Sequence, residues 1–281
     1  MSIKAEVIIP SLGRLEVLIS TLAAIRRLYP ELPIRVALQG EDRRDVLYRT
    51  MGSANFTVDY RETPALIPAL NDAIRRSPAE ICILLDDDAT PCDGWLEAHL
   101  GTMSEHPEAA YCYGREVNTT RWRSPMSELA RMGSEAVFGL FLPRETKLRG
   151  RIVGWTNGLG VVFGNFFLPG SCVINAPAEG NLAIRRDLFL ESGGFDERFR
   201  GNAWGYGPQW GLRLAARGHY GRYCGDAIMI HRQHASGGTR SAQRKVWYQD
   251  YVANNRLMWA EVGPFGWIGA MPRLLRRYFI L

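Results

Sequence analysis

Apolar runs alternate with amphipathic segments along the first 90 residues of the chain. The runs are short and rich in Val, Ile and Leu, which is typical of buried strands. In the segment after the first run, Leu18, Leu22 and Ile25 recur at helical spacing. Strands that alternate with helices predict a parallel sheet with helices on both faces. The predicted strands are residues 5–10, 34–39, 56–60 and 80–85, and the predicted helices are residues 15–28, 40–51 and 65–77.

Ligands of such sheets bind beyond the carboxyl ends of the strands. The loops at residues 10–14, 39–42 and 86–91 are therefore expected on one rim. After about residue 110 the pattern changes, with a strand at 110–117, a helical segment at 124–139 and a helical tail from about residue 236. The uncharged stretch 152–178 is broken by Gly and Asn, so we expect an apolar loop region or a buried strand pair rather than a membrane span.

Cysteine usage and charge narrow the class of protein. The five cysteines are scattered without a C-x-x-C pair, which argues against a disulfide framework or a zinc knuckle. The first residues lack the long apolar region of a signal peptide, so a reducing, cytoplasmic location is expected. The net charge of +5 comes mainly from arginines. No basic run is interleaved with aromatics, so we expect no nucleic acid partner.

The C-terminal sequence PFGWIGAMPRLLRRYFIL mixes large apolar residues with Arg273, Arg276 and Arg277. Such a segment can lie on an anionic membrane surface, which would make the protein peripheral at the inner face of the membrane. A packed C-terminal helix is the alternative, and it is the expectation we prefer.

Three adjacent aspartates, Asp86, Asp87 and Asp88, end the strand at 80–85. They could bind a hard cation, act as acid and base, or cap the next helix. Strand alternation sends Asp86 and Asp88 to one side and Asp87 to the other. Asp93 is better placed to cap the following helix, so the triplet is predicted to hold Mg²⁺ or Mn²⁺, which prefer oxygen ligands.

The stretches VIIPSLGR, ILLDDDATPCDGWLEAHL, GNLAIRRDLFLESGGFDERF and GLRLAARG together resemble the family 2 glycosyltransferases of the GT-A fold, over roughly residues 5–260. The resemblance implies a GT-A-like mixed, mostly parallel sheet flanked by helices, with a C-terminal helical extension. Residues 1–110 would then bind the donor, residues 111–235 the acceptor, and residues 236–281 would form the tail. The implied reaction is metal-dependent sugar transfer from a nucleoside-diphosphate sugar to a hydroxyl of a glycan, a lipid-linked sugar or a small molecule, with inversion preferred over retention.

The resemblance also implies site residues. The triplet matches the DXD motif, with Asp88 as direct ligand of Mn²⁺ or Mg²⁺ and Asp86 near the ribose and the water shell of the metal. Asp87 is counted with the donor-binding residues, although its side chain is expected to point elsewhere. His231 would complete the metal shell, with a surface histidine as the alternative, and His234 follows it. The loop carrying Arg240 could close over the diphosphate. The residues implied to cradle base and ribose are Pro10, Ser11, Arg14 and Gln39, the last standing where the family usually has an aspartate.

One expected feature is missing from the sequence. The family usually follows GGFDE with an acidic segment that supplies the general base of an inverting transfer. Here that segment reads GNAWGYGPQWGLRLAARG, with Tyr206, Gly207 and Gln209 in place of acids. The base could come from elsewhere, for example Glu179; the enzyme could be retaining; the acceptor could be acidic; or the chain could be a pseudoenzyme that only binds the donor. Aromatic side chains of this region could stack on an acceptor sugar or pack into the core: Trp204, Tyr206 and Trp210.

A nucleotidyltransferase is the remaining alternative from another class. Enzymes of that class start with a Gly-rich, basic phosphate loop after the first strand. The stretch PSLGRLE has a single glycine there, which counts against this alternative.

Overall fold

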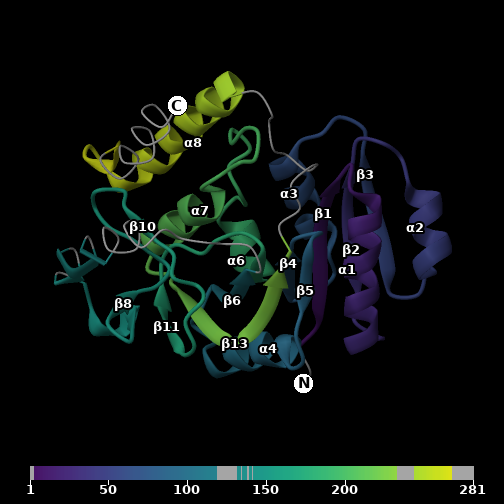
Figure 1. Cartoon of the computed structure of the whole chain (residues 1–281), viewed down its shortest axis with the longest axis horizontal. Coiled ribbons are helices and arrows are strands. Elements are labelled where there is room, and N and C mark those ends of the chain that lie inside the picture. The colour runs from purple at the N-terminus through teal and green to yellow at the C-terminus, as the bar shows by residue number, and fades with distance from the viewer. Residues whose placement is uncertain are drawn as a thin grey trace.

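The computed structural model describes residues 3–118, 132–133, 135–137, 139–140, 142–232 and 244–267 of the 281-residue chain. One mixed β-sheet runs through the molecule, with helices on both faces (Figure 1). Its strand order is β11-β13-β6-β12-β4-β1-β2-β3, and β5 pairs with β13. The strands are β1 (Ala5–Leu12), β2 (Ile34–Gln39), β3 (Phe56–Arg61), β4 (Ile81–Leu85), β5 (Ala89–Pro91), β6 (Tyr111–Asn118), β11 (Ser171–Ile174), β12 (Asn181–Arg185) and β13 (Gly221–His231).

Strand directions explain where a site can form. β1, β2, β3 and β4 are mutually parallel, while β12 runs antiparallel to both β4 and β6. β6 therefore runs the same way as β4, and β13 is parallel to β6. Because β12 lies between β4 and β6, both halves of the chain belong to one sheet, and most of its strands end at the same edge.

Two apolar cores lie on opposite faces of this sheet. Along β1, Ile8 faces one core whereas Val7 and Ile9 face the other, as strand alternation requires. Fully burying one such aliphatic side chain is worth roughly 1.5–3 kcal/mol, so these alternating positions fix both layers. The first core is covered by α3 (Leu66–Arg76), α6 (Arg186–Glu191) and α7 (Tyr206–Ala215), and the second by α1 (Leu15–Leu28), α2 (Arg44–Met51) and α4 (Trp95–Glu105).

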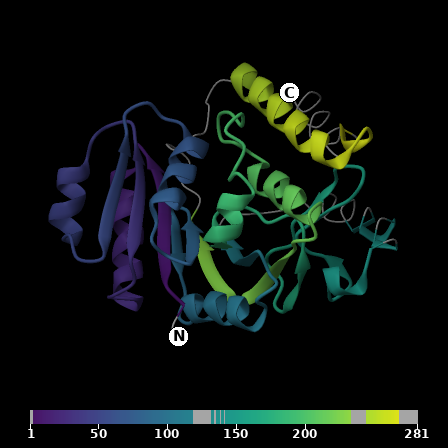
Figure 2. The same ribbon diagram turned by 180° about the vertical axis from the view of Figure 1, so that it is seen from behind.

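One short strand pair lies within the uncharged stretch of the second half, and another lies just before it. Antiparallel pairs join β9 (Trp155–Thr156) to β10 (Val162–Phe163), and β7 (Lys147–Leu148) to β8 (Arg151–Ile152), after the 3-10 helix η1 (Arg144–Thr146). Residues 152–178 thus hold the strand pair β9–β10, the strand β11 and connecting loops, where an apolar loop region or a buried strand pair was expected. Helix α8 (Arg244–Val262) then packs against α7, as Figures 1 and 2 show from opposite sides.

Several local predictions are corrected or fall outside the described residues. β1 does not end at Pro10 but continues to Leu12. Asp93 does not cap α4, because the N-cap is Gly94 in the left-handed conformation, without a side-chain cap bond. Within the described ranges, no helix is long and apolar enough to span a bilayer. His234, Arg240, most of the helical segment predicted at 124–139 and the basic tail from residue 268 lie outside the described residues.

Candidate functional site

The candidate site lies at the edge where the carboxyl ends of β1, β2, β4, β6 and β13 meet, which we call the strand-end rim. Asp86 to Asp88 leave β4 there, and the chain turns at once into β5. β5 pairs antiparallel with the end of β13, and this pairing places Ala89 opposite His231. The short β5 therefore brings the aspartate triplet against a histidine that lies far away in the sequence.

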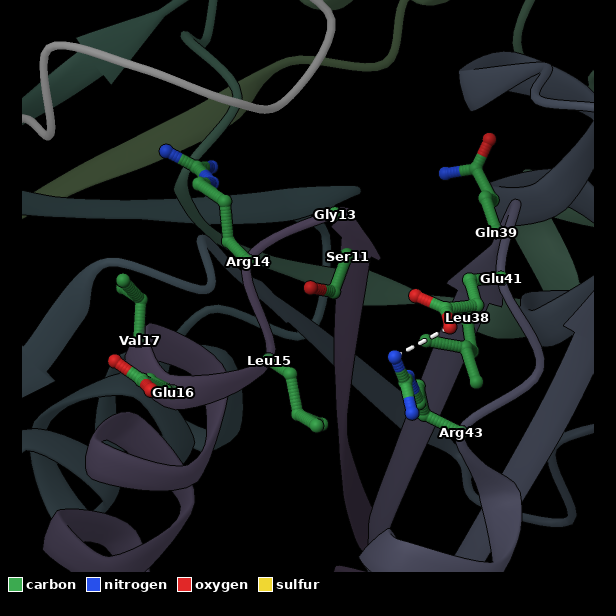
Figure 3. Close-up of a pocket in the computed structure, with 10 residues that line it drawn as sticks. All are labelled: Ser11, Gly13, Arg14, Leu15, Glu16, Val17, Leu38, Gln39, Glu41 and Arg43. Atoms are coloured by element: carbon green, nitrogen blue, oxygen red, sulfur yellow. Dashed lines mark ion pairs between the residues drawn. The ribbon is translucent and has the colours of Figure 1, made fainter.

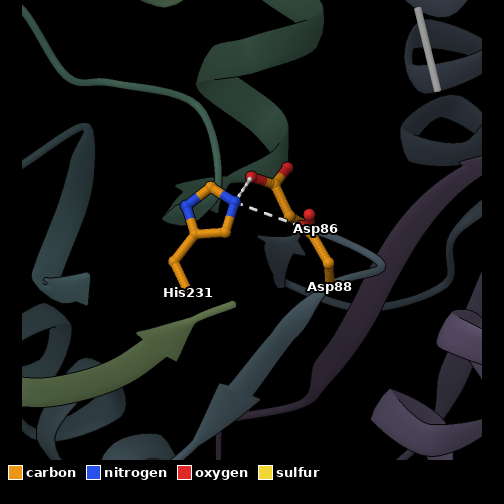
Figure 4. Close-up of side chains that lie close together, drawn as sticks. All are labelled: Asp86, Asp88 and His231. Carbon is orange, nitrogen blue, oxygen red and sulfur yellow. Dashed lines mark ion pairs between the residues drawn. The ribbon is translucent and has the colours of Figure 1, made fainter. Parts of the chain in front are cut away.

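Asp86, Asp88 and His231 form a compact cluster (Figure 4). The Nε2 atom of His231 lies 3.1 Å from Oδ1 of Asp88 and 3.6 Å from Oδ2 of Asp86. One ligand atom from each of the three side chains lies within 4.8 Å of the others. Two carboxylates and an imidazole that converge in this way are a suitable donor set for a divalent cation such as Mn²⁺.

The charges of this cluster shift its protonation. Enclosure within the protein, followed by the charges of neighbouring carboxylates, raises the pKa of Asp86 to about 6, although His231 opposes the shift. Asp86 still exposes 35% of its side chain, so it remains open to a ligand. Burial alone would lower the pKa of His231, but the hydrogen bond to Asp88 and the charge of Asp86 outweigh it and raise that pKa. Excess negative charge at such a cluster favours a cation.

Asp87 is not part of this cluster and contacts instead the segment of residues 11–14, here called the first loop. Its carboxylate accepts a hydrogen bond of 2.7 Å from Oγ of Ser11 and pairs with Arg14. Thr21 of α1 donates to its backbone oxygen at 2.7 Å. Arg14 also reaches Asp88 at 3.1 Å, so a single guanidinium links the first loop to two members of the triplet. Asp87 therefore anchors the first loop to the turn between β4 and β5.

A pocket of about 420 Å³ opens between the ends of β1 and β2 (Figure 3). Ser11, Arg14 and Gln39 line it, whereas Pro10 lies within β1 and is not among the lining residues. Gln39 is almost fully buried, and its Oε1 accepts a 2.8 Å hydrogen bond from the backbone N–H of Ala65. Since a backbone N–H can only donate, the Nε2 group of Gln39 is the one left to face the pocket.

Glu179 stands close to Asp86, just before β12. Burial and then the charge of Asp86 raise the pKa of Glu179 to about 7, while hydrogen bonds from the backbone N–H groups of Gly205 and Gly207 oppose the shift. These two glycines belong to the start of α7, the segment that carries no acid. A Cβ at position 207 would meet the backbone oxygen of Pro177 at 2.9 Å, so glycine permits this close approach.

The aromatic candidates differ in exposure. Trp210 is fully buried, and its Nε1 donates to Oγ of Ser192 at 2.9 Å, so it is a core residue and the acceptor assignment is corrected. Tyr206 is only 5% exposed and packs edge-on against Phe195. Trp204 is partly exposed and packs against Tyr251 of α8. Of these three aromatic side chains, Trp204 offers the most surface to a ligand.

Two nearby residues were not anticipated from the sequence. Glu116 lies near the end of β6, and its charge acts on Asp86, Glu179 and His231. Gly180 leaves room for Asp86, because a Cβ there would meet Oδ2 of that aspartate at 2.3 Å. Glu116 could have been found from the parallel direction of β6, which brings its carboxyl end to the same rim.

Comparison with solved structures places this arrangement among known folds. GalNAc-T7 with UDP, GalNAc and Mn²⁺ aligns with a TM-score of 0.59 and 13% identity, covering 98% of this chain and 54% of that one. The mannosyltransferase PcManGT from Pyrobaculum calidifontis, in complex with GDP-Man and Mn²⁺, aligns with a TM-score of 0.57 and 14% identity, covering 100% and 71%. TarS from S. aureus aligns with a TM-score of 0.56 and 13% identity, covering 92% and 65%. The fold is thus the expected GT-A fold.

The sequence comparison is more specific. Comparison with curated proteins found no match to this chain. The chain spans about half the length of the GalNAc-T7 chain. Residues 6–165 match the profile of glycosyl transferase family 2, which is more than half of the 281 residues. The chain belongs to glycosyl transferase family 2.

Proposed function

We propose that the protein is a metal-dependent glycosyltransferase that moves a sugar from a nucleoside-diphosphate sugar to a hydroxyl acceptor. The observation that carries the proposal is the cluster of Asp86, Asp88 and His231 beside the pocket between β1 and β2. Family membership supports the reaction class. Two solved structures of the same fold hold a nucleotide or a nucleotide sugar together with Mn²⁺, which supports the donor class.

The side chains of the cluster fit Mn²⁺ well, with Mg²⁺ as the alternative. Asp88 and His231 would be direct ligands, and Asp86 would complete the set. Mn²⁺ accepts both imidazole and carboxylate, whereas Mg²⁺ prefers oxygen alone. When bound, such a cation neutralises the charge that develops on the leaving diphosphate. Arg14 and Asp87 would keep the first loop at a fixed distance from these ligands.

The order of the strands suggests how the donor lies. β4, β1 and β2 are neighbours, and adjacent strands are ~4.8 Å apart, so the ends of β4 and β2 are separated by roughly 10 Å. A diphosphate at the end of β4, a ribose over Ser11 and a base beside Gln39 would follow this line. The pocket lining of Ser11, Arg14 and Gln39 supports this orientation.

Glu179 is the general base of the proposed reaction. A base works best when its pKa lies near the working pH, and the pKa of Glu179 is raised to about 7. The N–H groups at the start of α7 hold its carboxylate, so the acid-free helix would position a base that comes from another segment. A base at this place fits an inverting transfer. Trp204 and Tyr206, at the same end of α7, would border the acceptor.

A panel of nucleotide sugars tests the proposal. Donor hydrolysis is measured with Mn²⁺, with Mg²⁺ and with EDTA, and we expect turnover of at least one donor that EDTA abolishes. Turnover that is independent of metal would contradict the assignment of the cluster. Donor binding without any turnover would select a pseudoenzyme. The configuration of the released sugar decides between inversion and retention.

A further inference from the structure

The side chain of Asn181 joins four separate segments behind the strand-end rim. It is fully buried on β12, directly after Gly180. Its Oδ1 accepts hydrogen bonds from Nε1 of Trp95 at 2.7 Å and from Nε2 of His99 at 2.9 Å, both on α4. Its Nδ2 donates to the backbone oxygens of Ala227 at 3.0 Å and Arg115 at 3.3 Å. Each polar atom of the amide therefore has two partners.

The chemistry of the partners fixes the orientation of this amide. An indole N–H can only donate, so the atom facing Trp95 must be the oxygen. The amide nitrogen is then directed at two carbonyl oxygens, which can only accept. His99 is neutral, because burial lowers its pKa to about 4, and it presents Nε2–H to the same oxygen. Exchange of the amide oxygen and nitrogen would place like groups against one another at every contact.

The carbonyl of Ala227 belongs to an irregularity in β13. The register between β13 and β6 shifts between Cys224 and Ile228, and Ala227 lies in that shifted part. A bulge leaves backbone groups without a ladder partner, and a buried carbonyl without a hydrogen bond is destabilising. The amide of Asn181 supplies the missing donor. After the bulge, β13 resumes at Ile228 and ends at His231.

The neighbouring strand β6 has a glycine, Gly114, where the side chain of Asn181 crosses it. A Cβ at Gly114 of β6 would meet Nδ2 of Asn181 at 2.2 Å and the oxygen of Ala227 at 2.3 Å. Only glycine at this position lets the side chain of Asn181 pass over β6 to reach β13. The register shift, the glycine and the asparagine are thus parts of one arrangement.

We infer that Asn181 is a positioning residue. It sets where the regular pairing of β13 with β6 starts again after the bulge, at Ile228, and thereby places His231 against Asp86 and Asp88. The inference rests on the proposed function, since it assigns a role toward the same metal ligands. Asn181 touches none of them. It acts through the bulge on one side and, through the adjacent Gly180, borders Asp86 on the other, where the backbone N–H of Asp86 donates to the oxygen of Gly180 at 3.4 Å.

Asn181→Asp is the decisive variant because it has the same shape and keeps the acceptor for Trp95 and His99. It places a second oxygen against two carbonyls, so the end of β13 should shift. Changes of residues behind metal ligands typically lower metal affinity 10–100-fold, and we expect the Mn²⁺ dissociation constant to rise about tenfold. Trp95→Phe is the milder variant, expected to raise it about threefold while the fold is retained.

Asn71→Asp is the matched control. Asn71 is also a buried amide whose Nδ2 donates to the backbone oxygen of Phe195 at 2.9 Å and whose Oδ1 accepts from its N–H at 3.0 Å, but it serves the loop after α6. The Asn71→Asp variant should lower the unfolding temperature without changing the affinity for Mn²⁺. A shift in Mn²⁺ affinity of the same size in both variants would mean a general loss of structure and would overturn the inference.

A double-mutant cycle with His231→Ala tests the coupling. If Asn181 acts through His231, the double variant should bind Mn²⁺ about as weakly as His231→Ala alone, because interacting positions are not additive. Additive losses, or wild-type affinity in Asn181→Asp, would overturn the inference and leave the proposed function intact. Absence of Mn²⁺ binding in the wild type would instead overturn the proposed metal site. Amide hydrogen exchange without metal then decides the inference: residues 228–231 should exchange faster in Asn181→Asp but not in Asn71→Asp, and unchanged exchange would reject it.

Discussion

The strand-end rim and the start of α7 hold two carboxylates that act on each other, Asp86 and Glu179, but they achieve their electrostatics in opposite ways. At the rim, side chains supply the charge: Asp86 and Asp88 converge with His231. At the start of α7 the side chains are committed elsewhere, and Gln209 donates from Nε2 to Glu261 of α8 at 2.9 Å. There the backbone N–H groups of Gly205 and Gly207 bind the carboxylate of Glu179.

The difference shows that a segment without acidic side chains can still hold, through its backbone, a carboxylate that comes from another segment. The N-terminus of a helix attracts a carboxylate through its free N–H groups and its dipole. Changes at the rim should therefore alter chemistry with little effect on folding. Changes at the side chain of Gln209 in α7 should alter folding with little effect on chemistry, and Glu179 should behave like a rim residue.

The largest effect is expected for Asp88→Asn. The side chain keeps its size but loses the charge that faces His231 and a bound cation, so donor hydrolysis with Mn²⁺ should fall by about 10³-fold. Asp93→Asn is the matched control, because Asp93 follows shortly after β5 and is exposed. Hydrolysis rates within a factor of ten of the wild type in Asp88→Asn would remove this residue from the site.

Glu179→Gln should lower donor hydrolysis about 10²-fold or more, while the affinity for the donor nucleotide stays close to that of the wild type. A general base acts when deprotonated, so the wild-type rate should rise with pH through the pKa of Glu179, about 7, and then level. A cation beside Asp86 would move this rise to lower pH. The rise should be absent in Glu179→Gln.

Glu80→Gln is the control for this experiment, because Glu80 is exposed at the opposite end of β4. If Glu179→Gln keeps the wild-type rate and pH profile, Glu179 is not the base. Glu116 is then the next carboxylate to test, since its charge acts on the same cluster.

Sequence patterns predicted the first half of the fold well and the second half less well. The strands β1, β2 and β4 are apolar runs, and the helix after β1 carries a clear apolar stripe at Leu18, Leu22 and Ile25. The place of β12 between β4 and β6, and the bulge in β13, depend on contacts between distant segments. Local periodicity carries no signal for such contacts.

The candidate site divides in the same way. Strand alternation grouped Asp86 with Asp88 and set Asp87 apart, but the three residues form the turn between β4 and β5, so their approach to His231 depends on the pairing of β5 with β13. The same rule could not tell that Trp210 is buried while Trp204 is partly exposed. It also could not reveal the approach of Glu179 to α7, which depends on backbone N–H groups that every sequence possesses.

Gln209→Glu tests whether this position is structural. Sequence comparison would regard the change as restoring an acid, but Gln209 is buried and faces Glu261. Two facing carboxylates in place of a hydrogen bond should lower the free energy of unfolding by about 2 kcal/mol, measured by urea titration. The double variant Gln209→Glu and Glu261→Gln should regain most of the loss. A faster donor hydrolysis in Gln209→Glu would contradict the structural role.

The smallest effect concerns the choice of nucleotide at Gln39. The oxygen of its amide is bound by Ala65, and Figure 3 shows its nitrogen on the side facing Ser11 and Arg14. An N–H donor in this place matches the ring nitrogen acceptor of cytosine better than the N–H of uracil.

In Gln39→Glu one carboxylate oxygen can still accept from Ala65, and the other now faces the pocket as an acceptor. The ratio of CDP to UDP affinity, measured by calorimetry with Mn²⁺, should then shift toward UDP by about tenfold, which is about 1.4 kcal/mol. The added charge repels both nucleotides equally, so the ratio is the informative quantity. Gln39→Met offers neither a donor nor an acceptor, so it should weaken CDP more than UDP and shift the ratio by less than Gln39→Glu does. A ratio unchanged in Gln39→Glu would show that the base does not meet this side chain.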